Sequence, residues 1–210
     1  MSTNLTEKSK KLFNSILKKE KIKKYLKELK KHHRESYEHI LRAGLLCIKL
    51  GYKNKFSKED IKLLGYSGLF HDAGKIKIPK EILSKKSLLS KEEKKIIDNH
   101  SRFSFSRLND SEDNKIKKII IMHHEYQTNP YPRKLSDRRK NKRKKERRIK
   151  IHSEIYKINK LAEILAVADM YDALKNKRAY KKQLTKKEIE KILNVQFSGD
   201  RRYIKQVLER

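Results

Sequence analysis

Proline and glycine, the two residues that most often interrupt helices, are rare in this chain. Only 3 Pro and 6 Gly occur among its 210 residues, and this scarcity favours long helices over many short strands. Apolar residues recur three or four positions apart in most segments, whereas no stretch alternates apolar and polar residues between turn signals. The sequence therefore predicts an all-α protein with few or no strands.

Apolar residues at helical spacing predict the individual helices. The expected helices cover residues 5–30, 34–50, 57–71, 90–100, 116–123, 161–174 and 185–195. Ser90 with Glu93, and Thr185 with Glu188, each form the pattern of a capping box, which marks a helix start. Gly51 is the expected end of the second helix, because glycine is common just beyond helix C-termini.

The length of the chain suits one domain with a hydrophobic core and is short for two. Charged residues make up 40% of the sequence, so the apolar residues must be well segregated to build that core. We expect residues 1–33 to form a basic amphipathic helix. This helix would pack on a domain that spans residues 34–210.

The formal net charge of +31 is large and favours contact with polyanions such as nucleotides or nucleic acid. Lysine is enriched along the whole chain, so the charge alone does not assign a partner. The segment 133–150 is more unusual, with 12 basic and 2 acidic residues among 18. Leu135 and Ile149 are its only apolar residues, so it cannot bury a face. We interpret it as a basic insertion, either a solvated helix or a loop, that is a candidate for nucleic-acid contact.

The single cysteine, Cys47, excludes an internal disulfide framework and a zinc site built on several thiolates. It lies in an apolar run and is expected to pack in the core. Residues 1–30 are rich in lysine and lack the apolar run of a signal peptide. No apolar stretch approaches the ~20 residues that span a bilayer. The sequence therefore predicts a cytoplasmic protein without a membrane span.

Five of the eight histidines accompany apolar helices rather than the basic surface, together with the carboxylates of Asp72 and Asp169. These histidines are His39, His71, His100, His123 and His124. A single histidine in such a place is usually a core residue with a hydrogen-bond partner, and Asp169 alone could be bonded to backbone. Burying the whole set without compensation would cost several kcal/mol. A shared metal site would compensate all of them together.

The spacing of these residues suits metal binding. Glu35 and His39 are four residues apart, so both can reach one ion from the same helix face. Adjacent pairs such as His123 and His124 point about 100° apart on a helix, so one pair can contact two ions. Imidazoles and carboxylates without thiolates favour iron, manganese or a similar ion. Two such ions about 3.5–4 Å apart can clamp a phosphate.

In chain order, these residues resemble the motifs of the HD-GYP family of cyclic di-GMP phosphodiesterases. The resemblance covers residues 35–195 apart from the basic insertion. Its five blocks are residues 39–46 (HILRAGLL), 69–79 (LFHDAGKIKIP), 88–100 with its final histidine, 123–125 (HHE), and a final block made of 164–174 (ILAVADMYDAL) and 178–181 (RAYK). One histidine–aspartate pair would be weak evidence, whereas five ordered blocks are specific.

The resemblance implies a helical bundle of about seven to nine helices around a di- or trinuclear site with two or three divalent ions, Fe or Mn. The implied metal ligands are His39, His71, Asp72, His100, His123, His124 and Asp169, with Glu35 helping to hold a third ion. Asp72 and Lys75 would be catalytic. Lys75, Arg178 and Lys181 would contact substrate phosphates, and Tyr131 would contact the substrate. A metal-bridging hydroxide would open a cyclic dinucleotide, with cyclic di-GMP the expected substrate, to a linear dinucleotide.

One loop departs from the family pattern. After the HHE motif, family members have Asp-Gly and then Gly-Tyr-Pro, whereas residues 126–132 read YQTNPYP and lack both glycines. Pro130 cannot take the positive φ that glycine allows and offers no N–H. Two alternatives therefore stay open. One is a hydrolase for another nucleotide or RNA phosphate ester, and the other is a binding protein with a non-catalytic metal site.

Overall fold

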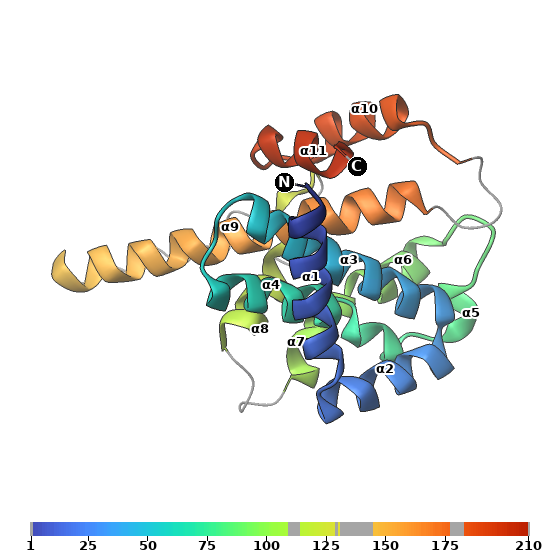
Figure 1. Cartoon of the computed structure of the whole chain (residues 1–210). Coiled ribbons are helices and arrows are strands. Elements are labelled where there is room, and N and C mark those ends of the chain that lie inside the picture. The colour runs from blue at the N-terminus through green and yellow to red at the C-terminus, as the bar shows by residue number, and fades with distance from the viewer. Residues whose placement is uncertain (1, 109–113, 129, 131–144, 177–182, 210) are drawn as a thin grey trace.

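The computed structural model describes residues 2–108, 114–128, 130, 145–176 and 183–209. Within these ranges it contains helices and no strand, apart from an isolated bridge between Gln127 and Phe197. The all-α prediction is confirmed (Figure 1). The α-helices are α1 (Ser2–Leu17), α2 (Glu20–His32), α3 (Arg34–Lys53), α4 (Lys58–Phe70), α5 (Lys80–Leu83), α6 (Lys91–Asp98), α7 (His100–Arg107), α8 (Asn114–Met122), α9 (Lys145–Lys175), α10 (Lys186–Gln196) and α11 (Arg201–Leu208). Two 3₁₀ turns, η1 (Ala73–Lys77) and η2 (His123–Tyr126), follow α4 and α8.

The predicted helix starts at Ser57, Ser90 and Thr185 are confirmed. The Ser57 hydroxyl accepts a hydrogen bond from the Asp60 amide. At Ser90 and Thr185 both halves of a capping box form with Glu93 and Glu188. These side chains satisfy amides that have no partner within the helix, so each start is fixed locally by the sequence.

The described helices outnumber the expected seven to nine, because some expected helices are divided. The single helix expected over 5–30 is two helices, α1 and α2, and Lys19 between them has extended backbone with φ −68° and ψ 129°. The helix expected over 90–100 is likewise divided into α6 and the start of α7. The short helix α5 and the C-terminal helix α11 were not predicted from the sequence.

The prediction that Gly51 ends the second helix is wrong, because α3 continues to Lys53. Gly51 serves packing instead. A Cβ atom at this position would lie 3.0 Å from side-chain atoms of both Ile61 and Leu64 on α4. The missing side chain thus lets α3 and α4 approach closely, which is a second common reason for glycine inside a helix.

Two clusters of buried side chains form the core. One surrounds α9, whose residues 161–168 are all nearly inaccessible, and it includes residues of α10 and α11. The other joins α1 and α2 to α3 and α4, with Phe13, Ile16 and Leu29 among its buried members. Helix α3 packs against α1, α2, α4 and α9, and therefore lies between the two clusters. Figure 1 shows α10 and α11 over one side of α9, and the N-terminal end of α9 extending past the other helices.

Part of the expected basic insertion, residues 133–144, lies outside the described residues. The remainder, from residue 145, forms the beginning of α9. None of the helices in the described ranges is long and apolar enough to cross a membrane.

Candidate metal centre

Side chains from five parts of the chain converge at the centre of the molecule. His39 comes from α3, His71 and Asp72 from the end of α4, and Asp169 from α9. His100 begins α7, and His123 with His124 begins η2. They form two groups in which the ligand atoms all lie within 4.8 Å of one another. The first group is His39, His71 and Asp169, and the second is His100, His123 and His124.

In the first group the ligand atoms are about as close as neighbours around one ion. His39 Nε2 lies 3.0 Å from Asp169 Oδ1 and 3.2 Å from His71 Nε2. His71 Nε2 lies 3.6 Å from the same Asp169 oxygen. Metal–nitrogen bonds of roughly 2.1 Å place adjacent ligands about 3 Å apart, so these three side chains fit a shared cation.

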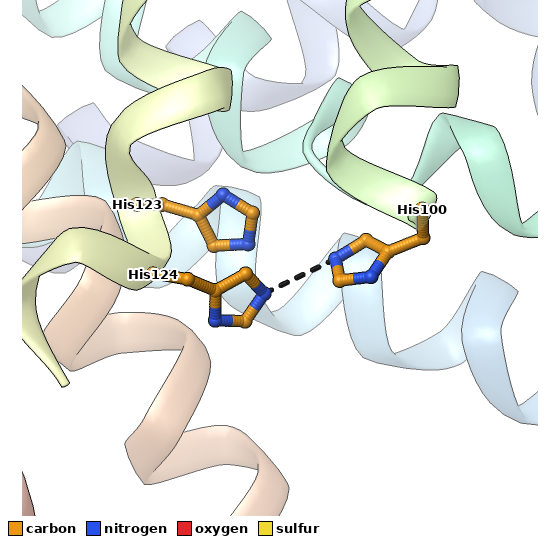
Figure 2. A group of neighbouring side chains, drawn as sticks. All are labelled: His100, His123 and His124. Atoms are coloured by element: carbon orange, nitrogen blue, oxygen red, sulfur yellow. Dashed lines mark hydrogen bonds between the residues drawn. The ribbon is translucent and has the colours of Figure 1, made fainter. Parts of the chain in front are cut away.

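The second group faces the first from α7 and η2. Figure 2 shows His100 opposite His123 and His124, with all three imidazoles converging. His100 Nε2 and His124 Nε2 are 3.1 Å apart. His123 Nε2 is completely buried and has no hydrogen-bond partner among the residues that the structure describes. A buried nitrogen without a partner is costly unless something else satisfies it, and a metal ion would do so.

Asp72 lies between the two groups. Its Oδ1 is 3.3 Å from His100 Nε2 in the second group. Its Oδ2 is 3.5 Å from His71 Nε2 and 3.6 Å from His39 Nε2 in the first group. Each oxygen of one carboxylate thus faces a different group, which is the arrangement that a ligand bridging two ions requires.

Three of the histidines are oriented by backbone. The Nδ1–H of His71 donates to the Gly68 carbonyl at 2.9 Å, that of His100 to the Ile97 carbonyl at 2.8 Å, and that of His123 to the Ile120 carbonyl at 2.5 Å. In each case the acceptor is three residues earlier, in the last turn of the preceding helix, where carbonyls lack an amide partner. These bonds place the proton on Nδ1 and leave Nε2 to bind a metal.

The Nδ1 of His39 has a different partner, a carboxylate that the sequence analysis did not single out. Its Nδ1–H donates to Asp172 Oδ2 at 2.8 Å. Asp172 also accepts from Arg42, whose Nε lies 2.9 Å from Oδ1. In the sequence, Arg42 follows His39 by three positions and Asp172 follows Asp169 by three, but this spacing alone does not show that the two residues meet.

Burial and neighbouring charges shift the pKa values in opposite directions. Burial lowers the pKa of His100 to about 4 and that of His123 to about 3, so both are neutral at pH 7. Burial also lowers the pKa of His39, but hydrogen bonds to Asp169 and Asp172 outweigh it and raise the pKa to about 9. For Asp72, burial raises the pKa, but Lys75 and the surrounding histidines hold it well below its ordinary value. At pH 7 the imidazoles of His100 and His123 are therefore neutral and the carboxylates are ionised, which are the forms that bind metal, whereas His39 must first lose a proton.

Lys75 adds a cation at the edge of this site. Its ammonium donates to Asp72 Oδ2 at 2.5 Å. The turn that carries it is fixed by Ser104, whose hydroxyl accepts from the Gly74 amide at 2.8 Å and donates to the His71 carbonyl at 2.7 Å. Gly74 packs directly on the backbone of α7, where a Cβ atom would overlap the His100 carbonyl oxygen.

The structure brings together seven of the predicted metal ligands and Lys75. Glu35, the eighth predicted ligand, is exposed one turn before His39 and belongs to neither group. The predicted substrate contacts Tyr131, Arg178 and Lys181 lie outside the described residues. The donor set fits divalent ions that accept nitrogen and oxygen ligands.

Comparison with known proteins agrees with this geometry. The sequence profile of the HD domain matches residues 36–174. A cyclic di-GMP phosphodiesterase response regulator of Xanthomonas campestris is 30% identical over 155 residues, covering 72% of this chain and 35% of the relative. A 3′3′-cGAMP-specific phosphodiesterase of Vibrio cholerae is 28% identical, covering 78% of this chain and 28% of its own length. A cyclic di-GMP phosphodiesterase of Thermotoga maritima is 31% identical, covering 70% and 36% respectively. The chain thus spans about a third of the length of these curated relatives.

Proposed function

Because this chain belongs to the HD domain family, we propose that it is a metal-dependent phosphodiesterase that opens a cyclic dinucleotide to a linear one. The position of Asp72 between the two histidine groups is the observation that carries this proposal. The relatives support the substrate class, since all three are named as phosphodiesterases of cyclic dinucleotides. The resemblance of the sequence motifs to those of cyclic di-GMP phosphodiesterases supports the same substrate class.

The first group with Asp72 Oδ2, and the second group with Asp72 Oδ1, would each hold one divalent ion. The histidines and carboxylates favour iron or manganese over zinc held by thiolates. When bound, two such ions polarise a phosphate and make a water molecule a better nucleophile. Asp72 would contribute one oxygen to each ion, because its two oxygens face different groups.

Lys75 would act on the charge of the phosphate. Its ammonium already reaches Asp72 Oδ2, so a phosphate that binds beside the ions lies within its range. A lysine ammonium is a compact point charge that suits phosphate oxygens. Its charge would stabilise the extra negative charge that develops on the phosphate during attack.

Four further residues belong to the same proposal. Glu35 would help to hold a third ion, since it precedes His39 by one helical turn. Arg178 and Lys181 would bind the phosphates of the substrate, and Tyr131 would contact the dinucleotide. These assignments rest on the motif resemblance.

The test is hydrolysis by protein that has been purified without oxygen and loaded with Mn²⁺ or Fe²⁺. Cyclic di-GMP, cyclic di-AMP and 3′3′-cGAMP are each incubated with it, and the products are identified by mass spectrometry. A linear dinucleotide that forms only in the metal-loaded protein would support the proposal. The proposal would be wrong if metal-loaded wild-type protein cleaves none of the three dinucleotides. If that protein hydrolyses a mononucleotide or an RNA end instead, it has a different phosphohydrolase activity.

A further inference from the structure

We propose that Asp172, supported by Arg42, is a positioning residue that orients the imidazole of His39 for metal binding. The inference rests on the metal centre of the proposed function and adds two residues to it. His39 Nδ1 donates to Asp172 Oδ2 at 2.8 Å, while His39 Nε2 points to Asp169 Oδ1 at 3.0 Å. The imidazole therefore has one nitrogen on the positioning carboxylate and the other on the ligand side.

The place of His39 in the fold explains why it needs a side-chain partner. His71, His100 and His123 follow the ends of helices, and each finds a backbone carbonyl in the last turn. His39 is the sixth residue of α3, which continues to Lys53. The carbonyls one turn before it are engaged by amides of the helix itself. Since no helix end supplies an acceptor here, the carboxylate of Asp172 from α9 takes that role.

Asp172 is itself held in place from several sides. Arg42 Nε donates to Oδ1 at 2.9 Å and to Oδ2 at 3.1 Å, and Arg42 Nη2 donates to Oδ2 at 3.0 Å. Asn176 Nδ2 donates to Oδ1 at 2.9 Å. The residue is only 5% exposed. A carboxylate with this many donors has one defined orientation. Because His39 Nδ1 donates to this carboxylate, the orientation of the His39 ring is fixed as well.

The four residues form a repeated arrangement on two helices. On α3 the ligand His39 is followed three positions later by Arg42, and on α9 the ligand Asp169 is followed three positions later by Asp172. Residues three apart lie on one helix face. His39 and Asp169 therefore face each other across the two helices as ligands. Three positions later, Arg42 and Asp172 face each other as an ion pair that aligns the same two helices. A carboxylate on the outer nitrogen of a ligating histidine fixes its tautomer and increases its basicity as a ligand.

The experiment measures Mn²⁺ binding by competition with a fluorescent chelator, in wild-type protein and in the variants Asp172→Ala, Asp172→Asn and Arg42→Ala. Losing such a partner typically weakens metal binding by roughly 10–100-fold. We expect a loss of this size for Asp172→Ala. The loss should affect mainly the ion held by the first group, because Asp172 bonds to His39, which belongs to that group. Asp172→Asn should lose less, since its amide oxygen can still accept from Nδ1–H.

Arg42 is expected to act through Asp172, and a double-mutant cycle tests this. Arg42→Ala should weaken Mn²⁺ binding in the wild-type background and have no further effect in Asp172→Ala. The matched control is Asp60→Asn, which changes another buried carboxylate with a cationic partner, Lys157, at the opposite end of α4. This control should leave Mn²⁺ affinity unchanged even where it lowers the melting temperature.

Three results would overturn the inference. One is wild-type Mn²⁺ affinity in folded Asp172→Ala, and the second is an equal loss of affinity in Asp60→Asn. If Asp172→Ala does not fold, the isosteric Asp172→Asn is measured in its place. The third result would be that this variant has the wild-type Mn²⁺ affinity and that its Co²⁺ form has the wild-type visible spectrum. Wild-type protein that binds no Mn²⁺ would instead overturn the proposed function itself, so the two failures are distinguishable.

Discussion

The ammonium of Lys75 lies 2.5 Å from Asp72 Oδ2, the oxygen that also faces His39 and His71. This lysine therefore lies on the side of the carboxylate that also faces the first group of histidines. Its positive charge offsets the negative charge of a carboxylate that is buried. A bound divalent ion would repel the ammonium, which would then be available to a phosphate.

Replacing Lys75 by methionine should separate metal binding from turnover. Lys75→Met removes a cation that competes with metal for Asp72, so Mn²⁺ affinity should stay equal to that of the wild type or increase. Turnover of a cyclic dinucleotide should fall by about 10²–10³-fold, the usual loss when one group that stabilises developing charge is removed. The measurements are chelator competition and kcat on metal-saturated protein. A variant that loses metal and activity in parallel would show that Lys75 serves the structure of the site instead.

Asp72→Ala should abolish hydrolysis and reduce the number of bound ions. Its two oxygens face different histidine groups, so its loss affects both positions. Metal analysis after removal of loosely bound ions should give about two ions per wild-type chain and fewer in the variant. Full metal content with a near-normal rate would contradict the bridging role. Circular dichroism serves as the control that the helical fold is retained.

Metal binding should release a proton and strengthen as the pH rises from 7 to 9. His39 has a pKa of about 9 in the metal-free protein, because hydrogen bonds to Asp169 and Asp172 outweigh the effect of burial. It is therefore protonated at pH 7 and must lose its Nε2 proton to act as a ligand. Because this proton must leave, the affinity for Mn²⁺ should rise by about tenfold per pH unit up to pH 9 and should stay constant above pH 9. His100 and His123 are already neutral at pH 7 and add nothing to the slope.

Isothermal titration calorimetry in buffers of different ionisation enthalpy measures that proton directly. At pH 7.5 roughly one proton should be released for the ion that His39 binds. A Mn²⁺ affinity that does not change between pH 7 and 9 would contradict the assignment of His39 as a ligand.

Gly74→Ala should destabilise the protein and disturb the site together. A Cβ atom there would overlap the His100 carbonyl oxygen and lie 2.6 Å from the Ser104 amide nitrogen, and both are backbone atoms that cannot rotate away. We expect a loss of about 2–3 kcal/mol in unfolding free energy, near the upper end for overpacked positions. The matched control is Gly51→Ala, where the nearest atoms are the side chains of Ile61 and Leu64 at 3.0 Å and can shift. Urea unfolding of both metal-free variants makes the comparison, and a smaller effect at Gly74 than at Gly51 would contradict it.

The metal ligands could be predicted from the sequence because ionisable residues are conspicuous beside apolar helical runs. Asp169 follows five apolar residues, and His71 ends a helix with an apolar face. Asp172 and Arg42 could not be recognised in this way. A charged pair is unremarkable in a chain with 57 Lys and Arg residues, and only the packing of α3 on α9 shows that these two meet.

The helix ends were predictable where a side chain caps them and not elsewhere. Ser57, Ser90 and Thr185 cap their helices with hydrogen bonds that the local sequence determines. The division between α1 and α2 falls in a lysine-rich stretch without proline or glycine, so tertiary packing decides it. Helix α11 was missed because it has only eight residues, although the Asp200 side chain that caps it was a usable signal.

Hydrolysis should discriminate only weakly among cyclic dinucleotides. The groups assigned to the substrate in this proposal, the two ions and Lys75 with Arg178 and Lys181, all act on phosphate, which every such substrate shares. Selectivity between bases requires polar groups that the wrong base leaves unpaired. The loop that would carry them begins after Tyr126, whose hydroxyl donates to the Asn159 carbonyl at 2.9 Å. It lacks the two glycines of the family pattern.

We therefore expect kcat/KM values for cyclic di-GMP, cyclic di-AMP and 3′3′-cGAMP that differ by less than ~10³-fold, or about 4 kcal/mol. A simple aryl phosphodiester, which has no base, controls for the chemistry of the metal centre alone. Weak discrimination with fast cleavage of all three dinucleotides would indicate that the ions and cations supply most of the transition-state binding. A preference above ~10³-fold for one of them would contradict this prediction. It would then place base recognition in the loop around Pro130, because the phosphate contacts are the same for every substrate.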